Sequence, residues 1–357
     1  MSKSELTPPL ANESLVAQRI TLRDIAKELN VSHVTVSKAL RDLPGVSSKL
    51  KIRIQKKAKT MGYVPDPVLA SLSNYRLSKK ANVIQSEIAW VNPWKQTGKT
   101  EIYNEFDLYW KGALETANSL GYRLQEYKTS EFSLARLSGI FTTRNIQGVL
   151  IPPFREQFTD LKNFDWSHFA VVRFGQIDDQ LPTHSVKSAQ VSNTMLSFDH
   201  ARRLGYKRIG FVCEYQRNRY FGAGFNWAQM SLPPKDQLPL HKLDLSMSFE
   251  KMQLAFNNWL NKYNPDCILA DNSETHEMLS NLEWKIPQDI GLATTSIHDT
   301  SIDTGIDQRP HEIGKAAIRM LVALIAEKNL GIPECRNETL IEGKWIDGPM
   351  LPKKRDS

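Results

Sequence analysis

The sequence predicts a small all-α N-terminal domain followed by a larger α/β domain built of two lobes. Residues 21–41 have the pattern of two short helices around a tight corner. Residues 83–350 alternate short apolar runs with amphipathic helices, which is typical of parallel sheets covered by helices. The alternation restarts near residue 193, so we expect two similar lobes.

The pattern over residues 21–41 predicts a helix-turn-helix. Thr21 is a good N-cap, and Asp24 three residues later gives it the character of a capping box. Asn30 tolerates the left-handed conformation that ends a helix, and Ser32 can cap the next one. The outer positions of the second helix are polar and basic. We therefore expect this helix to lie in a DNA groove rather than to belong to an ordinary helical hairpin.

Residues 47–61 predict a third helix, rich in Lys and Arg. The linker that follows, residues 65–82, can form two helical turns at 66–73, and a helix this short needs a partner to hold it. Leu69 and Leu72 would lie on this helix. Two interpretations of Leu72 stay open: an apolar wedge at a base step of a DNA minor groove, or inward packing against the next domain.

The distribution of charge indicates a binder of nucleic acid. The chain has 357 residues and a net charge of +7, and its length suggests two or three domains. Residues 1–80 hold 15 Lys and Arg against 6 Asp and Glu, a net charge of +9, which leaves −2 for the remainder. A solvated surface explains single lysines but not so uneven a split. The excess matches the electrostatic footprint of a protein that contacts the phosphate backbone.

The apolar runs and the helical periodicity place the elements of the larger domain. Expected strands are 87–91, 122–127, 148–151, 169–174, 208–213, 267–270, 290–294 and 338–342, and expected helices are 109–120, 134–145, 193–204, 249–263 and 312–328. The expected organisation is a disordered tail at 1–18, a DNA-binding domain at 19–64, the linker at 65–82, lobes at about 83–188 with 308–330 and about 190–306 with 331–350, and a tail at 351–357. Ligands of such folds bind beyond the carboxyl ends of the strands, so we expect a ligand between the lobes.

Several classes of protein are disfavoured by the sequence. It has no GxSxG, HExxH, GxGxxG or Walker motif, so we expect no enzyme activity and no cofactor. Its three cysteines have no paired spacing, which indicates small buried apolar residues, a reducing compartment and no metal site. No run has the apolar length of a membrane span and the first 18 residues do not resemble a signal peptide, so we expect a cytoplasmic protein.

Together these segments resemble the GalR–LacI family of bacterial repressors, whose larger domain has the fold of periplasmic binding proteins. The resemblance rests on TLRDIAKELNVSHVTVSKAL at 21–40, VSSKLKIRI at 46–54, GYVPDPVLASL at 62–72, LGYKRIGFV at 204–212 and GIDQRPHEIG at 305–314. It implies a dimeric transcription regulator on a pseudo-palindromic operator in double-stranded DNA, controlled by a small-molecule effector between the lobes. The C-terminal residues carry no leucine heptad, which favours a dimer over a tetramer.

The resemblance also implies positions for DNA contacts. His33, Val34 and Lys38 fall at the variable base-reading positions, where Lys38 can donate to guanine and Val34 can meet a thymine methyl group. The remaining expected contacts are Thr21, Thr35 and Ser37 to phosphates and the hinge leucines Leu69 and Leu72 to the minor groove. Leu69 stands where the family usually has alanine.

The expected effector contacts lie at strand ends. They are Asn92, Trp94, Arg173, Arg219, Asp271, Asn272 and Gln308. Aromatic stacking with a few polar groups suits sugars and nucleosides. The alternatives are loop capping for Asp271 and Asn272, lobe packing for Trp94, and satisfaction of backbone groups for Gln308. For Arg219, a register two residues later, next to Gly224, stays open.

Two other functions share parts of this design. A solute-binding protein has the same two lobes, and an enzyme of this α/β class with an accessory DNA-binding domain would also fit the domain order. The basic N-terminal domain and the missing catalytic motifs favour the regulator.

Overall fold

A computed structural model describes residues 20–40, 45–63, 86–92, 104–152, 164–175 and 181–354. The chain divides into two compact units, residues 1–81 and residues 82–357, which are described separately here. Within the described residues, no helix is long and apolar enough to cross a membrane.

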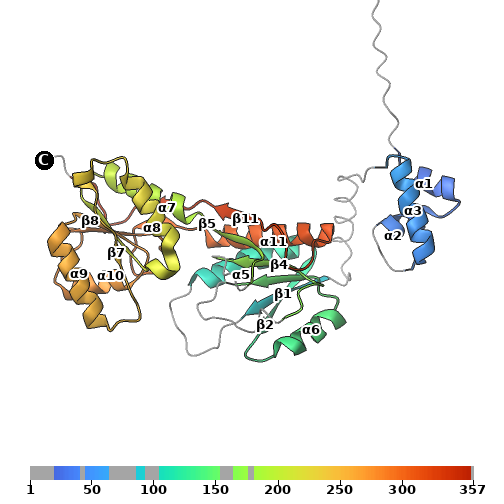
Figure 1. The fold of residues 1–357 in the computed structure, drawn as a ribbon, viewed down its shortest axis with the longest axis horizontal. Helices are drawn as coiled ribbons and strands as arrows, with labels where there is room; N and C mark the ends of the chain where they lie inside the picture. Colours follow the sequence, from blue (N-terminus) through green and yellow to red (C-terminus); the bar gives the residue numbers. More distant parts are fainter. Residues whose placement is uncertain are drawn as a thin grey trace, which may run out of the picture. The chain divides into compact units, whose positions relative to one another are not determined.

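The described residues of the first unit form three of the predicted helices (Figure 1): α1 (Leu22–Leu29), α2 (His33–Leu40) and α3 (Ser48–Thr60). The helix predicted at residues 66–73 lies outside the described residues. The carboxylate of Asp24 accepts hydrogen bonds from Thr21 N and Thr21 Oγ1, both at 2.7 Å, so the predicted contact between these two residues is present. Asn30 has the left-handed φ of 51°. Ser32 Oγ accepts from Thr35 N at 3.0 Å and caps α2. These local interactions fix the corner between α1 and α2.

The three helices of the first unit share one small apolar core. Its members come in pairs from α1, α2 and α3: Ile25, Ala26, Val36, Ala39, Ile54 and Ala58. The two alanines of α1 and α2 are small enough for the helices to approach closely. Everything else that α2 carries is left at the surface or partly covered, as the predicted recognition helix requires.

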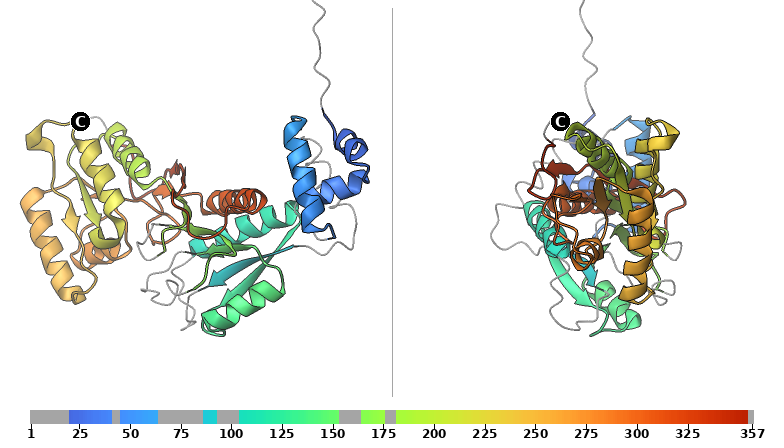
Figure 2. Two further views of the ribbon diagram at one scale, coloured as in Figure 1. Left: turned by 45° about the vertical axis from the view of Figure 1, so that its right-hand side comes forward. Right: turned by 90° about the vertical axis from the view of Figure 1, so that its left-hand side faces the viewer.

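The first lobe of the second unit is a parallel sheet with the strand order β11-β5-β4-β3-β1-β2. Its strands are β1 (Ser86–Asn92), β2 (Tyr122–Lys128), β3 (Gly148–Ile151), β4 (Ala170–Phe174), β5 (His184–Ser188) and β11 (Glu338–Ile341). Helices α5 (Asn104–Ser119) and α11 (Pro310–Glu327) cover one face and α6 (Leu134–Thr143) the other. Figure 2 shows α6 separated from α5 and α11 by the sheet. Burial on both faces explains the nearly continuous apolar runs of the strands.

The second lobe repeats this plan with the strand order β12-β10-β9-β8-β6-β7. Its strands are β6 (Ile209–Cys213), β7 (His241–Lys242), β8 (Cys267–Ala270), β9 (Gly291–Thr294), β10 (Gly305–Asp307) and β12 (Lys344–Ile346), of which β12 is antiparallel to β10. Helices α7 (Gln190–Arg203) and α8 (Tyr215–Gln229) cover one face, and α9 (Phe249–Tyr263) and α10 (Glu274–Asn281) the other. The predicted restart of the fold near residue 193 is therefore a second complete lobe.

The described chain passes between the lobes at three places: from β5 to α7, from β10 to α11, and from β11 to β12. Asn193 joins the first and third of these crossings. Its Nδ2 donates to Ser188 Oγ at 2.7 Å, and its Oδ1 accepts from Gly343 N at 2.9 Å. Asn193 is buried, so both bonds are shielded from water. The Asn193 side chain thus links the first crossing to the third, next to the backbone hydrogen bond from Ala189 N to Ile341 O at 2.9 Å.

The structure corrects two predicted boundaries. We expected residues 331–350 in the second lobe, but β11 pairs with β5 in the first lobe, because the chain crosses back only after Ile341. We expected a tail from residue 351, but Leu351 is buried in the apolar core of the second lobe. An apolar residue at 351 and the polar contacts after it hold this segment in place.

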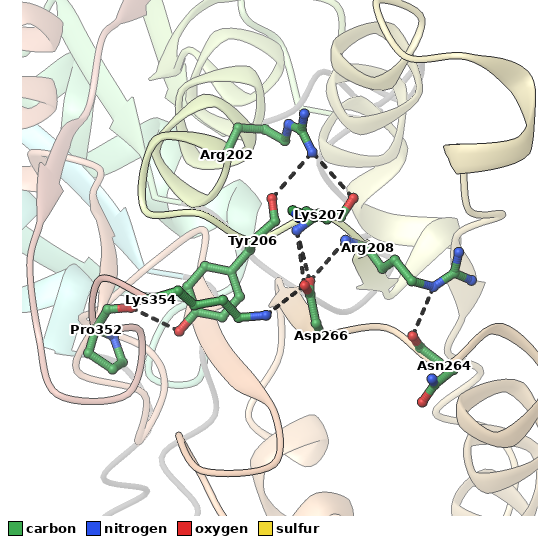
Figure 3. A network of polar contacts seen from close by, with 8 residues as sticks. All are labelled: Arg202, Tyr206, Lys207, Arg208, Asn264, Asp266, Pro352 and Lys354. Carbon is green, nitrogen blue, oxygen red and sulfur yellow. Dashed lines mark hydrogen bonds and ion pairs between the residues drawn. The ribbon is translucent and has the colours of Figure 1, made fainter. Parts of the chain in front are cut away.

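Figure 3 shows how the segment after β12 is attached. Lys354 Nζ forms an ion pair with Asp266 Oδ2 at 2.7 Å, and Tyr206 OH donates to Pro352 O at 3.0 Å. The Asp266 carboxylate also accepts from the backbone N–H groups of Lys207 and Arg208. These contacts tie the C-terminal segment to the loops that open β6 and β8.

The cysteines differ from expectation at one position. Cys213 and Cys267 are buried as predicted, but Cys335 is exposed. Cys335 lies in the loop before β11.

The close packing of α5 on α11 generates a prediction about stability. A Cβ on Gly314 would lie 2.2 Å from Tyr109 O, a backbone atom that cannot move aside alone. Gly314→Ala should therefore lower the free energy of unfolding of the second unit by roughly 1–3 kcal/mol, the usual cost of overpacking. Chemical denaturation of the full chain measures this value.

Gly139→Ala is the matched control, because Gly139 lies inside helix α6 and a Cβ there meets nothing within 4 Å. Alanine is the better helix former, so this change should raise stability by about 0.5–1 kcal/mol. Equal effects of the two substitutions would contradict the close α5–α11 contact.

Candidate DNA-reading and effector-binding sites

The predicted DNA-reading side chains lie on the outer face of α2. His33, Val34 and Lys38 are exposed, with 49% of Val34 accessible, while Thr35 and Ser37 are half-buried. An apolar side chain this exposed has no role in the core of the unit. Thr21 is exposed at the start of α1, where its hydroxyl donates to Asp24. The structure thus leaves all three predicted base-reading side chains open to a ligand.

Three of the predicted site residues lie outside the described residues. They are Leu69 and Leu72 of the predicted hinge and Trp94 after β1. Their roles stay predictions.

In the first lobe, the predicted effector contacts Asn92 and Arg173 lie near the carboxyl ends of β1 and β4. Asn92 Nδ2 donates to Glu126 Oε1 at 2.7 Å, which links β1 to β2. Arg173 is buried, and one of its terminal nitrogens lies 3.4 Å from Leu181 O. A guanidinium this deep in a lobe is costly without partners. Both side chains therefore help to build the lobe at the edge where a ligand is expected.

In the second lobe, Asp271 and Asn272 follow β8 and are joined to each other. Asn272 Nδ2 lies 3.0 Å from Asp271 Oδ1, and Glu214 N donates to the same carboxylate oxygen at 2.9 Å. Asn272 Oδ1 accepts from both Thr275 N and Thr275 Oγ1. This arrangement corresponds to the capping alternative for Asn272, because its amide oxygen already serves the start of α10.

Gln308 and Arg219 also have contacts within the protein. Gln308 is buried and its Nε2 donates to Thr295 O at 2.8 Å, which is the backbone-satisfying alternative raised for it. Arg219 is exposed on α8, with its guanidinium carbon 5.2 Å from the centre of the Tyr220 ring. Of these two side chains, Arg219 is the one that a ligand can reach.

Sequence reasoning missed Glu105, which joins the two lobes. Glu105 lies in the first turn of α5 in the first lobe, and 8% of it is exposed. Its Oε1 accepts a 2.6 Å hydrogen bond from Ser296 Oγ, which follows β9 in the second lobe. Asp299 also forms a side-chain hydrogen bond with Glu105. We call Glu105, Ser296 and Asp299 the lobe junction.

The lobe junction brings two carboxyl groups together in a buried place. Burial first, and the nearby charge of Asp299 second, raise the pKa of Glu105 to about 8. Tyr109 on α5 lies beside it, and burial raises the pKa of this phenol as well. On the second lobe, Asp307 faces the same region and its Oδ1 lies 3.0 Å from His298 Nε2. A hydrogen bond between two carboxyl groups needs one proton, so the junction holds Glu105 or Asp299 in the acid form.

Among the described residues, no group of three His, Cys, Asp or Glu side chains could hold a metal ion. What the geometry provides is a three-helix domain with an open recognition face, and two α/β lobes whose strand ends carry polar groups. That combination defines the class of transcription regulators that bind DNA through a helix-turn-helix and carry an effector-binding domain.

Comparison with known proteins identifies the family. Residues 21–66 match the model of bacterial regulatory proteins of the lacI family, and residues 198–344 match that of periplasmic binding protein-like domains. The chain therefore carries a DNA-binding domain of the lacI family and a periplasmic binding protein-like domain. It is 24% identical over 342 residues to the HTH-type transcriptional regulator RegA of Clostridium saccharobutylicum, an alignment that covers 88% of this chain and 95% of RegA.

Two solved structures share the fold. One is the complex of the transcriptional regulator CelR with cellobiose, with a TM-score of 0.56, 16% identity, and coverage of 93% of this chain and 100% of that one. The other is the lac repressor dimer bound to operator and the anti-inducer ONPF, with a TM-score of 0.53, 16% identity, and coverage of 94% and 100%. The predicted fold class is therefore confirmed.

The lobe junction generates a prediction about pH. Because the pKa of Glu105 is raised in the closed contact, the contact is favoured at low pH and weakens as pH rises from about 4.5 to about 8. An interlobe distance followed by a pair of fluorophores, one on each lobe, should increase over this range. Glu105→Gln keeps a neutral hydrogen-bonding side chain and should remove most of this pH dependence.

Asp107→Asn is the control, since Asp107 is an exposed acid on the same helix. It should leave the pH profile of the interlobe distance unchanged. A Glu105→Gln protein with the wild-type profile would show that another group controls the contact.

Proposed function

We propose that this LacI-family regulator is a repressor that binds a pseudo-palindromic operator as a homodimer and is controlled by a sugar or a related metabolite. The observation that supports this most is the pairing of an open recognition helix with two lobes that meet through a proton-requiring contact. A ligand between the lobes would change that contact. The titles of the related structures name cellobiose for CelR, and operator and ONPF for the lac repressor.

The proposed DNA contacts follow from exposure and chemistry. Lys38, His33 and Val34 read bases in the major groove, and Thr21, Thr35 and Ser37 contact phosphates. Leu69 and Leu72 enter the minor groove at the centre of the operator. For the effector we propose Arg173, Arg219 and Asp271, with Asn92, Trp94, Asn272 and Gln308 supporting the site around them.

The test is a selection of genomic fragments by the purified full-length protein, followed by footprinting of the bound sequences. We expect a protected site of two related half-sites, because one recognition helix offers few base contacts. Adding sugars one at a time should change the affinity for that site at least tenfold in one case. Absence of any sequence-selective binding would overturn the regulator and leave a solute-binding protein or an enzyme of the two-lobed class.

Base reading by Lys38 generates its own prediction. Lys38→Ala should cost roughly 1–3 kcal/mol of discrimination between the selected site and random DNA, as expected for a side chain that contacts a base edge. Titrations on both DNAs at one salt concentration measure it.

Lys27→Ala is the control, because Lys27 is exposed on α1 rather than on the recognition helix. This variant should keep the discrimination of the wild type. If Lys38→Ala weakened binding to both DNAs equally, Lys38 would be a phosphate contact instead.

A further inference from the structure

Helix α3 has an unusual charge composition. Its 13 residues, SKLKIRIQKKAKT, include six Lys and Arg side chains and no acid. Cations near the first turn oppose the helix dipole, which favours negative charge at that end. The cations in the first turn of α3 therefore interact unfavourably with the helix dipole.

The cations of α3 gather mainly on one face. Lys49, Ile52, Arg53, Lys56 and Lys59 follow the spacing of a single helical face, and all five are exposed. We call these residues the α3 stripe. The opposite side of the helix carries the core residues Ile54 and Ala58.

Among the residues that the structure describes, the cations of the α3 stripe have no anionic partner. The ion pair of α3 within this part of the chain joins Lys57 Nζ to Glu28 Oε2 at 2.7 Å, and Lys57 lies outside the stripe. Lys49 and Arg53 are four residues apart, and Arg53 and Lys56 three, so like charges are neighbours on the helix surface. Such pairs destabilise a helix. An anionic ligand would offset this repulsion.

The α3 stripe and the recognition face of α2 point in different directions. Val36 and Ala39 of α2 meet Ile54 and Ala58 of α3 in the shared core. The exposed side of each helix therefore looks away from the other helix. A duplex held against α2 would leave much of the α3 stripe open to solvent.

We propose that the α3 stripe binds the sugar–phosphate backbone of a second DNA segment while α2 reads the first. Ten residues separate Lys49 from Lys59, about 15 Å along the helix at 1.5 Å per residue. A duplex presents about four phosphates per strand over that length. Regular, closely spaced negative charge is the ligand that suits a row of four cations, and the exposed Ile52 among them can pack on the sugars. The proposal rests on the proposed function, because it assumes that this unit binds DNA.

The test uses the full-length protein and random-sequence 40-base-pair duplexes at low salt. One duplex is immobilised and saturated with protein, and the capture of a second, labelled duplex is then measured. The wild type should capture the second duplex. A variant with Lys49→Gln, Arg53→Gln and Lys56→Gln should bind the first duplex but capture at least tenfold less of the second.

A variant with Lys235→Gln, Lys251→Gln and Lys353→Gln is the matched control, since it removes the same charge from exposed positions of the second unit. It should capture the second duplex as the wild type does. Thermal melting followed by circular dichroism shows whether the α3 variant folds. We expect it to melt no lower than the wild type, because its like-charge contacts are gone.

Three outcomes would overturn the proposal. If the α3 variant captures as much second duplex as the wild type, the bridging comes from the two recognition helices of a dimer. If the wild type captures no second duplex, and the affinity of the variant for the first duplex depends less on salt than that of the wild type, then the stripe contacts the first duplex. If polyglutamate displaces the second duplex at equal charge, the stripe suits acidic proteins instead. Failure of the wild type to bind even the first duplex would overturn the proposed function as well.

Discussion

The way in which the two lobes are held together depends on how the chain passes between them. Three crossings connect the lobes, and Asn193 fastens two of these crossings to each other through buried hydrogen bonds to Ser188 and Gly343. A buried amide with both ends engaged is costly to disrupt. Asn193 therefore holds two of the crossings together, and the lobe junction around Glu105 provides a further contact between the lobes.

This arrangement separates two kinds of polar residue at the strand ends. The side-chain amide groups of Asn272 and Gln308 form hydrogen bonds within the loops of the second lobe, so they stabilise the conformation of these loops. Glu105 instead spans the lobes, and its energy depends on their separation. A ligand acts on the lobes only through a difference in its affinity for the two arrangements. A group such as Glu105, which contacts the other lobe, is where such a difference can arise.

The fold was predictable wherever local sequence carries the signal. Residues 148–151, 249–263 and 267–270 were predicted with the bounds observed, because apolar runs and caps mark them. The strand β5, HSVKS, was missed, because its polar residues are buried only by tertiary packing. Helix α8 was missed, since two glycines interrupt its pattern. Glu105 could not be found, because Ser296 lies 191 residues away in sequence.

Helices α2 and α3 of the DNA-binding unit carry different kinds of exposed side chain, one kind suited to specificity and the other to affinity. The outer face of α2 offers a few uncharged or singly charged side chains, which can distinguish bases but supply little electrostatic attraction. The α3 stripe offers mainly positive charge, which attracts the phosphate backbone of any DNA sequence equally. Charge of this kind raises binding to right and wrong sites by the same factor, so it adds affinity without adding discrimination between sequences. If, as proposed, the α3 stripe holds a second DNA segment, it supplies affinity from one face of the unit while the outer face of α2 supplies the discrimination between sequences.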